Sequence, residues 1–218
     1  MTEQPSASRP GARSVKIGVD ERTGWSSDRP RREGAPERPA NIAVHCSVLK
    51  PTDRLRYSPG SLLVVVSASA AEREAFVTRL VDDRASLLSL AKVRGLLSGK
   101  VAEEELEDRA RELLAAAVAK RLQNRDTVVL VADGVGAEER EPFVRAAAAL
   151  KRPRHLILIE TSRDQVADED LPTLNALRRA LDEGELGEQG FQTALRLGGG
   201  TASEVKRLLF RPPPREDD

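Results

Sequence analysis

The residues with the most distinctive setting for chemistry lie where an apolar run meets a turn and a helix. Residues 61–76 read SLLVVVSASAAEREAF, so a buried strand leads directly into a helix start. Phosphate-binding loops of the pattern GxxxxGK(S/T) occupy this place, because backbone amides at a helix start hold phosphate oxygens. This loop contains no glycine and no lysine. The same residues fit a plain helix start, which we favour, with Ser69 as cap and Glu72 completing a capping box.

Asp133 is the acidic side chain best placed for a ligand. It follows the apolar segment TVVLVA, and ligands of open α/β sheets bind beyond the carboxyl ends of the strands. There its carboxylate could hold magnesium through a water molecule. An aspartate before Gly134 is also ordinary turn chemistry, which requires no ligand. The sequence leaves both interpretations open.

Composition argues against several other kinds of site and partner. The 218 residues carry 35 Lys and Arg against 35 Asp and Glu, so no net charge attracts nucleic acid or an anionic membrane. The single cysteine, Cys46, cannot form an internal disulfide, and with two histidines we expect no zinc cluster. The longest apolar run is far too short to cross a bilayer. These features predict a cytoplasmic protein.

The chain divides into a tail and one domain. Residues 1–40 are rich in Pro, Gly, Ser, Arg and Glu, and this composition lacks the apolar groups that offset the entropy cost of folding. We expect a disordered tail, in which residues 15–25, ending at Trp25, could form a short strand or a linear partner motif. Residues 41–210 are predicted to form the domain, and residues 211–218 a frayed end.

Within the domain, apolar strands alternate with amphipathic helices. The run LLVVV at residues 62–66 is apolar on both faces, which is typical of a central strand in a covered parallel sheet. Further strands are predicted at residues 41–47, 86–88, 127–132, 155–160 and 191–197, a turn at 50–60, and helices at 71–81, 92–97, 103–122, 138–150, 171–182 and 203–210. This order predicts an α/β fold, a three-layer sandwich around a mainly parallel, five-stranded sheet.

The order of these elements resembles the P-loop kinases related to polynucleotide kinase, which include zeta-toxin-like kinases with an AAA-type domain. The resemblance covers residues 51–197. It depends on the arrangement and on VLVADGVGAEEREPF at residues 129–143, which is similar to that family's strand, aspartate and arginine-bearing helix. The closing segment LGEQGFQTALRL is similar as well. The resemblance implies a P-loop NTPase-like fold.

The resemblance also implies that the phosphate loop is degenerate. Ser67 and Ala70 stand where the family has glycines or small residues. Arg73 replaces the lysine, and Glu74 stands at the serine or threonine. Glycines let amides converge on phosphates and the lysine adds a charge, whereas arginine is bulkier and planar. Glu74 brings negative charge toward phosphate and magnesium, so we do not expect tight ATP binding.

Two arginines match further positions of the family. The segment SLAKVR lies where such kinases carry an aspartate that activates the acceptor hydroxyl and an arginine that steadies the acceptor phosphate. Ala91 stands at the aspartate position and cannot accept a proton. Arg94 matches the arginine, although on composition alone it is a solvated helix residue. Arg140 either contacts a phosphate or, as we favour, pairs with Glu138 or Asp133.

Three other segments carry weaker signals. The family's nucleotide-clamping lid corresponds to residues 160–172, where Arg163 precedes acidic and amide side chains that repel phosphate, so we expect the lid to be lost or repurposed. GLLSGK at residues 95–100 looks like a phosphate loop but has the wrong spacing. GGGT at residues 198–201 connects a strand to a helix start, where an anion could bind, although a flexible connection is the simpler interpretation.

Three hypotheses about function follow. The first, which we favour, is a non-catalytic pseudoenzyme that binds an unknown protein partner or ligand, with neither membrane nor strong nucleic-acid binding. The second is a weak kinase that transfers phosphate from ATP, with magnesium, to a small hydroxyl compound or a nucleic-acid end. Its candidate residues are Arg73, Arg94, Asp133 and Arg140. The third is a regulatory module that holds a phosphorylated ligand without turnover. ATP and magnesium are expected cofactors only under the second.

Overall fold

A computed structural model of the protein describes residues 41–198 and 200–211. The strands are β1 (Ser47–Leu49), β2 (Arg54–Tyr57), β3 (Leu62–Val66), β4 (Leu87–Ser89), β5 (Val128–Val131), β6 (Arg154–Ile159), β7 (Thr193–Leu197) and β8 (Arg207–Phe210). The helices are α1 (Ala70–Leu80), α2 (Leu90–Leu97), α3 (Glu103–Gln123), α4 (Ala137–Ala149), α5 (Leu171–Asp182) and α6 (Thr201–Glu204). The predicted disordered tail with Trp25, and all but the first residue of the predicted frayed end, lie outside the described residues.

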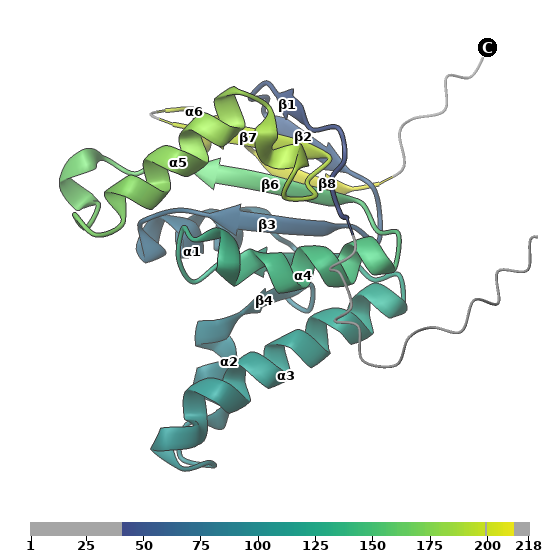
Figure 1. The fold of residues 1–218 in the computed structure, drawn as a ribbon, viewed down its shortest axis with the longest axis vertical. Coiled ribbons are helices and arrows are strands. Elements are labelled where there is room, and N and C mark those ends of the chain that lie inside the picture. The colour runs from purple at the N-terminus through teal and green to yellow at the C-terminus, as the bar shows by residue number, and fades with distance from the viewer. Residues whose placement is uncertain (1–40, 199, 212–218) are drawn as a thin grey trace, which may run out of the picture. The chain divides into compact units, whose positions relative to one another are not determined.

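A parallel sheet of six strands forms the centre of the domain (Figure 1). Its strand order is β1-β7-β6-β3-β5-β4, and every neighbouring pair is parallel. All five residues of β3 are fully buried, because β5 and β6 flank the strand and other elements cover both of its faces. The predicted α/β fold and the central place of LLVVV are confirmed. A central strand that runs into a loop and a helix fits a P-loop-like fold.

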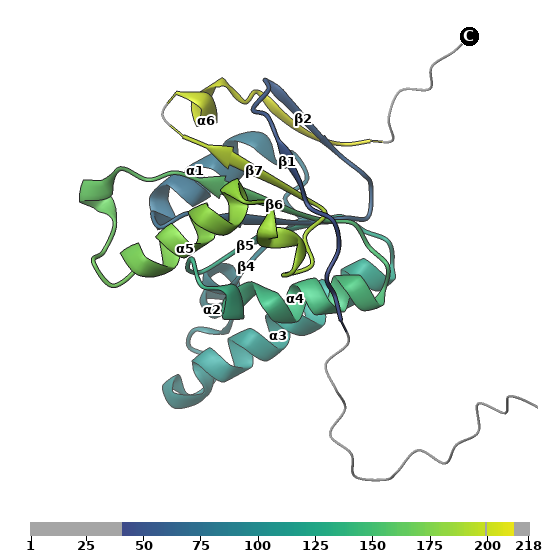
Figure 2. The same cartoon turned by 45° about the horizontal axis from the view of Figure 1, so that its top comes forward.

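The two faces of the sheet build two separate cores. Leu62, Val64 and Val66 of β3 pack on one side with α2, α3, α4 and α5. Leu63 and Val65 point to the other side, where α1 and the β2–β8 pair cover them. Side chains alternate between the faces of a strand, so one continuous apolar run serves both cores. Figures 1 and 2 show the longer helices α3, α4 and α5 on the face opposite α1. The three-layer arrangement is therefore confirmed.

The end of the described chain differs from the prediction. Residues 203–210 were predicted to be a helix, but α6 ends at Glu204 and residues 207–210 form β8. This strand pairs in parallel with β2, inside the segment predicted to be a turn. Leu55 and Leu208 both face the core beneath the pair, and each is at most 6% exposed. The short motif RLLF is compatible with the apolar periodicity of a helix or of a strand. It forms a strand because it pairs with β2, which is distant in the sequence.

The first strand of the central sheet also lies elsewhere than expected. Residues 41–47 were predicted as a strand, whereas β1 begins at Ser47, and the sheet has six strands where a five-stranded sheet was predicted. The preceding segment passes directly over Gly187, whose carbonyl accepts a hydrogen bond of 2.9 Å from the amide of Val44. A Cβ atom at position 187 would lie 2.1 Å from the Val44 oxygen, so glycine is required there. The other predicted elements begin and end within two residues of the observed ones.

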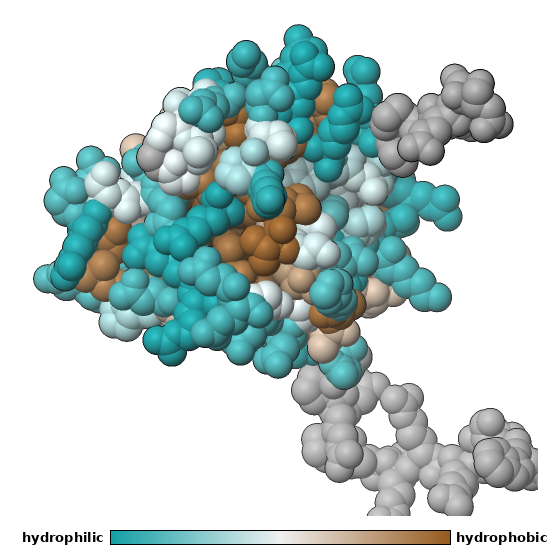
Figure 3. Space-filling view, turned by 90° about the horizontal axis from the view of Figure 1, so that it is seen from above, coloured by the Kyte–Doolittle hydropathy of each residue, from teal (hydrophilic) through white to brown (hydrophobic). Residues whose placement is uncertain are grey.

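Figure 3 shows one face of the molecule, on which hydrophilic residues surround a central apolar strip. Within the described ranges, no helix has both the length and the apolar character that a bilayer crossing requires.

His155 is a buried histidine on β6. Its Nδ1 shares a hydrogen bond of 2.8 Å with the hydroxyl of Thr193, and its ring packs against Tyr57 with a centroid distance of 4.7 Å. Nε2 is buried and has no hydrogen-bond partner among the described residues. Burial, with a smaller contribution from the charge of Arg154, lowers the pKa of His155 from 6.5 to about 4. The folded protein therefore holds this imidazole in its neutral form at neutral pH.

We predict that His155 makes the domain sensitive to mild acid. In the unfolded chain this histidine takes up a proton as pH falls below about 6.5, whereas in the folded domain it does so only near pH 4. Its contribution to the free energy of unfolding should be fully present above pH 6.5 and fall by about 3 kcal/mol at pH 4. Urea unfolding at several pH values should show this loss in the unaltered protein.

The His155→Gln variant should lose this component, so the difference in unfolding free energy between the two proteins should change with pH. His45→Gln, at an exposed position, is the matched control and should follow the unaltered protein. A His155→Gln difference that stays constant from pH 7 to pH 4 would contradict the prediction.

Candidate functional site

The loop between β3 and α1 begins the helix with a side-chain cap. The hydroxyl of Ser69 accepts a hydrogen bond of 3.3 Å from the amide of Glu72, which confirms the predicted N-cap. The second half of the predicted capping box is replaced by a long-range contact. The carboxylate of Glu72 accepts a hydrogen bond of 2.7 Å from the hydroxyl of Thr161, the second residue after β6. Glu72 thus ties the start of α1 to the neighbouring strand.

Two buried hydroxyls accept hydrogen bonds from the amide of Ser69 in the loop. Ser67 and Thr161 are both buried, and their hydroxyl oxygens lie 2.9 Å apart. Because Thr161 gives its only proton to Glu72, Ser67 donates in this pair. The amide of Ser69 donates to both hydroxyl oxygens, at 3.3 and 3.2 Å. Side chains of the protein therefore already satisfy this amide of the loop.

Arg73 points into the protein and not toward solvent. It is 4% exposed, and its guanidinium donates to the carbonyl of Ser67 at 2.7 Å and to the carbonyl of Asp133 at 3.0 Å. Burial lowers the pKa of Arg73, while the charges of Asp133, Glu74 and Glu139 oppose this shift. The guanidinium bridges the carboxyl ends of β3 and β5. Glu74 is exposed on α1 and influences Arg73 only through its charge; Ala70, the first residue of α1, is also exposed.

Arg94 and Asp133 lie together, as the candidate site requires, but both are held in ion pairs. Nε and Nη2 of Arg94 donate to the two carboxylate oxygens of Glu107, at 2.6 and 2.8 Å. Nη2 also donates to Oδ2 of Asp133 at 3.0 Å. The hydrogen bonds to Glu107 raise the pKa of Arg94 and lower the pKa of Glu107. Sequence reasoning missed Glu107, for which its spacing of four from Arg111 was the available signal.

Arg140 serves the local fold. It is 3% exposed, and Nη1 donates to the carbonyls of Val135 and Gly136 at 2.9 and 2.7 Å. Nη2 donates to the side-chain oxygen of Gln189 at 2.8 Å. Burial lowers its pKa to about 10. The predicted pairing was wrong: in the described part of the chain Arg140 forms no ion pair with an acidic side chain, and Glu138 and Glu139 act on it only through charge.

The weaker candidates lie apart from these residues. GLLSGK spans the end of α2 and the turn after it, and does not connect a strand to a helix. At the GGGT segment, the hydroxyl of Thr201 contacts the amide and carbonyl of Gly198; Gly199 is outside the described residues. In the region of the expected lid, Arg163 is exposed, and Glu160 pairs with Arg178 and Arg196. These arginines overcome the effect of burial and lower the pKa of Glu160.

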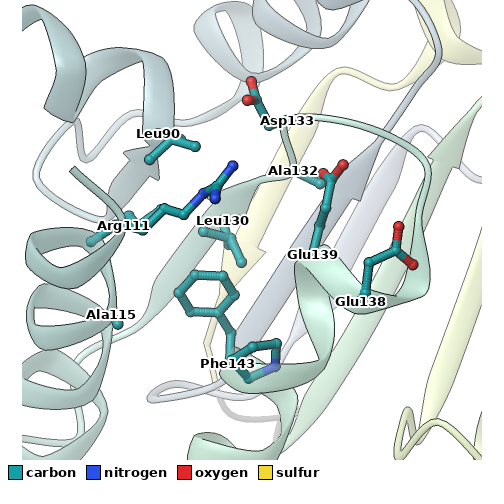
Figure 4. A pocket seen from close by; sticks show the side chains of 11 residues that line it. Leu90, Arg111, Ala115, Leu130, Ala132, Asp133, Glu138, Glu139 and Phe143 are labelled. Carbon is teal, nitrogen blue, oxygen red and sulfur yellow. The ribbon is translucent and has the colours of Figure 1, made fainter. Parts of the chain in front are cut away.

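A cavity of about 540 Å³ opens beside the carboxyl end of β5, between α2, α3 and α4 (Figure 4). The apolar part of its lining includes Leu90, Leu114, Ala115, Leu130, Ala132 and Phe143. The charged part consists of Arg111, Asp133, Glu138 and Glu139. Figure 4 shows Arg111 reaching in from α3, opposite Glu139 on α4. Of these charged residues, sequence reasoning singled out only Asp133 as a site residue. The cavity places it at the edge of a concave site.

The charges of the cavity differ in how they are satisfied. Asp133 pairs with Arg94, and Arg111 pairs with Glu107 at 2.8 Å. Glu139 accepts a hydrogen bond of 2.5 Å from the amide of Gly134. Over residues 41–198 and 200–211, neither Glu138 nor Glu139 forms an ion pair, and no group of three or more His, Cys, Asp and Glu side chains is arranged to hold a metal ion. Asp133 would therefore have to hold magnesium as a single carboxylate, which makes it a weak candidate.

Comparisons with known proteins add little to this geometry. No model of a protein family matches the chain, and no curated protein matches it. Among solved structures, a candidate kinase from Chloroflexus aurantiacus aligns with a TM-score of 0.40 and 16% sequence identity, over 67% of this chain and 88% of that chain. At this TM-score and identity, the likeness assigns neither a family nor an activity to the protein.

We predict that Arg73 stabilises the domain without any ligand. Replacing Arg73 with Ala leaves the carbonyls of Ser67 and Asp133 without their donor and opens a void, so the free energy of unfolding should fall by about 2–4 kcal/mol. Arg109→Ala, at an exposed position on α3, is the control and should change stability by less than about 0.5 kcal/mol. Urea unfolding measures both. Equal effects of the two substitutions would contradict an inward role for Arg73.

Proposed function

We propose that this domain is a non-catalytic relative of P-loop kinases that acts by binding a ligand or protein partner at the carboxyl edge of its sheet. The observation that carries the proposal is the guanidinium of Arg73, which is buried between the carbonyls of Ser67 and Asp133. A phosphate loop needs its cation and amides to face an open cradle. Here the cation at that position faces the protein.

Turning Arg73 outward would be costly. Its guanidinium satisfies two carbonyl groups, and a buried polar group left without a partner costs about 1–3 kcal/mol. A triphosphate would have to provide this free energy before it gained affinity from the arginine. The proposal therefore has an energetic basis beyond the loss of glycines.

The start of α1 already carries negative charge of its own. The carboxylate of Glu72 lies in the first turn, held by Thr161, where the helix dipole favours an anion. A phosphate group would meet this carboxylate at close range and be repelled. Glu72 thus takes the electrostatic role that a phosphate has in a nucleotide-binding loop.

The acceptor side of the proposed ancestral site supports the same conclusion. Ala91 offers no proton acceptor, and Glu107 holds the guanidinium of Arg94. Asp133 is occupied by Arg94, although it remains partly exposed. Weak kinase activity is the second candidate function, and the meeting of Arg94 and Asp133 at the sheet edge is the observation that favours it. The even charge balance and the buried thiol of Cys46 fit a cytoplasmic setting, which is part of the proposal.

We predict that the unaltered protein does not bind ATP with micromolar affinity. Titration with magnesium-ATP, followed by calorimetry and by thermal unfolding, should give no response below the millimolar range, because Arg73 and Glu72 are engaged within the protein. Magnesium-dependent binding at micromolar ATP that Arg73→Ala removes would overturn the proposal in favour of the kinase. Arg109→Ala serves as the control for nonspecific charge effects.

A further inference from the structure

We infer that the cavity beside β5 binds a small organic cation, an apolar or aromatic body that carries a protonated amine. The inference rests on the proposed function in that it names the ligand class for binding at the same edge of the sheet. It combines the shape of the cavity, its apolar floor and the imbalance of its charges.

The cavity has the size and lining of a small-molecule site. Its volume of about 540 Å³ falls within the range of roughly 300–1,000 Å³ that is typical of ligand pockets. Leu114 and Leu130, both at most 4% exposed, form part of the floor. Phe143 is half-buried against the same core and contributes its ring to the lining. These side chains would remove part of the apolar body of a ligand from water.

The charges of the cavity favour a cation. Arg111 is the only basic side chain in its lining, against three carboxylates, Asp133, Glu138 and Glu139. Arg111 and Arg94 are engaged by Glu107, and Arg94 also holds Asp133, so these four charges compensate one another. Glu138 and Glu139 form no ion pair among the described residues. The buried guanidiniums of Arg73 and Arg140 act on them through charge, but these groups donate their hydrogen bonds to backbone carbonyls and to Gln189. A protonated amine would donate charge-assisted hydrogen bonds to the carboxylate oxygens that these arginines leave free.

The carboxylates of Glu138 and Glu139 are both exposed, so water solvates them without an ion-pair partner. Both lie in the first turn of α4, where the helix dipole stabilises negative charge. Glu139 is further held by the amide of Gly134, which leaves its second oxygen for a ligand. The ring of Phe143, one turn along the same helix, adds a surface that attracts cations. Charge and ring therefore come from the same helix, which fixes the spacing of their backbone positions.

Three probes of matched shape test the ligand class on the full chain. Phenethylamine carries the ammonium, 2-phenylethanol is its uncharged counterpart, and 3-phenylpropionate carries the opposite charge. Titration followed by amide chemical shifts should show saturable binding of the amine, with shifts at the start of α4. The alcohol should bind at least about fivefold more weakly and the carboxylate more weakly still.

Four substitutions locate the binding. Glu139→Gln keeps an oxygen for the amide of Gly134 but removes the charge, so amine affinity should fall about fivefold to tenfold. Ala115→Trp, at an exposed position in the wall, should fill the cavity and abolish binding of the amine. Arg111→Gln removes a like charge and should strengthen amine binding. Glu112→Gln, on the exposed side of α3, is the control and should leave it unchanged.

The outcomes separate this inference from the proposed function. Selective amine binding that Glu139→Gln weakens and Ala115→Trp abolishes supports the cation site. No amine binding up to the millimolar range, equal binding of the three probes, or preference for the carboxylate overturns it. Those results leave the proposed function standing if magnesium-ATP also fails to bind. Micromolar binding of magnesium-ATP overturns the proposed function whatever the amine does.

Discussion

The bridge that Arg73 makes between two strands is the interaction on which the site depends. Its guanidinium joins the carbonyl after β3 to the carbonyl after β5, at the edge where ligands of open α/β sheets bind. A planar group with several donors can satisfy two carbonyls at once, whereas a lysine ammonium would do so with less fixed geometry. The same contact that joins the strand ends also removes the cation from solvent. The contact that supports the strand ends thus also keeps this guanidinium from meeting an anion in solvent.

The two faces of the sheet differ in whether the elements that cover them leave a cavity. One face carries α1 together with β2 and β8, and its core is closed beneath them. The other face carries α2, α3 and α4, which leave the cavity beside β5. Arg94, Glu107 and Asp133 lie at its border and fix α2, α3 and the end of β5 relative to one another. The ion pairs of Arg94 therefore stabilise the side of the site that faces the cavity, whereas Arg73 stabilises the side that faces α1.

Much of the fold could be predicted because its signals are local. The buried run at β3, the long α3 and the capped start of α1 each carry a pattern within their own residues. The β2–β8 pair could not be found in this way, because each strand is four residues long and its partner lies about 150 residues away. The same limit applied to β1. Short segments take their structure from what they pack against.

The sequence identified several residues of the candidate site but did not predict how their side chains are oriented. Asp133 and Arg94 were identified and do meet, and Arg73 does lie at the loop. The guanidinium of Arg73 points inward because it donates to the carbonyls of Ser67 and Asp133, and the sequence does not show that these carbonyls lie within its reach. Glu107 and Glu139 were missed because charged residues are common on exposed helix surfaces, and only tertiary structure shows which of them face a cavity.

The pairing of β2 with β8 has a consequence for biosynthesis. During translation β2 leaves the ribosome before α1 to α6, the α-helices in the described part of the chain, while β8 follows them. Until that late segment emerges, Leu55 and Tyr57 lack their neighbouring strand, and the sheet face beneath them stays partly uncovered. The nascent domain must therefore keep an apolar face from associating with other chains until β8 has been synthesised.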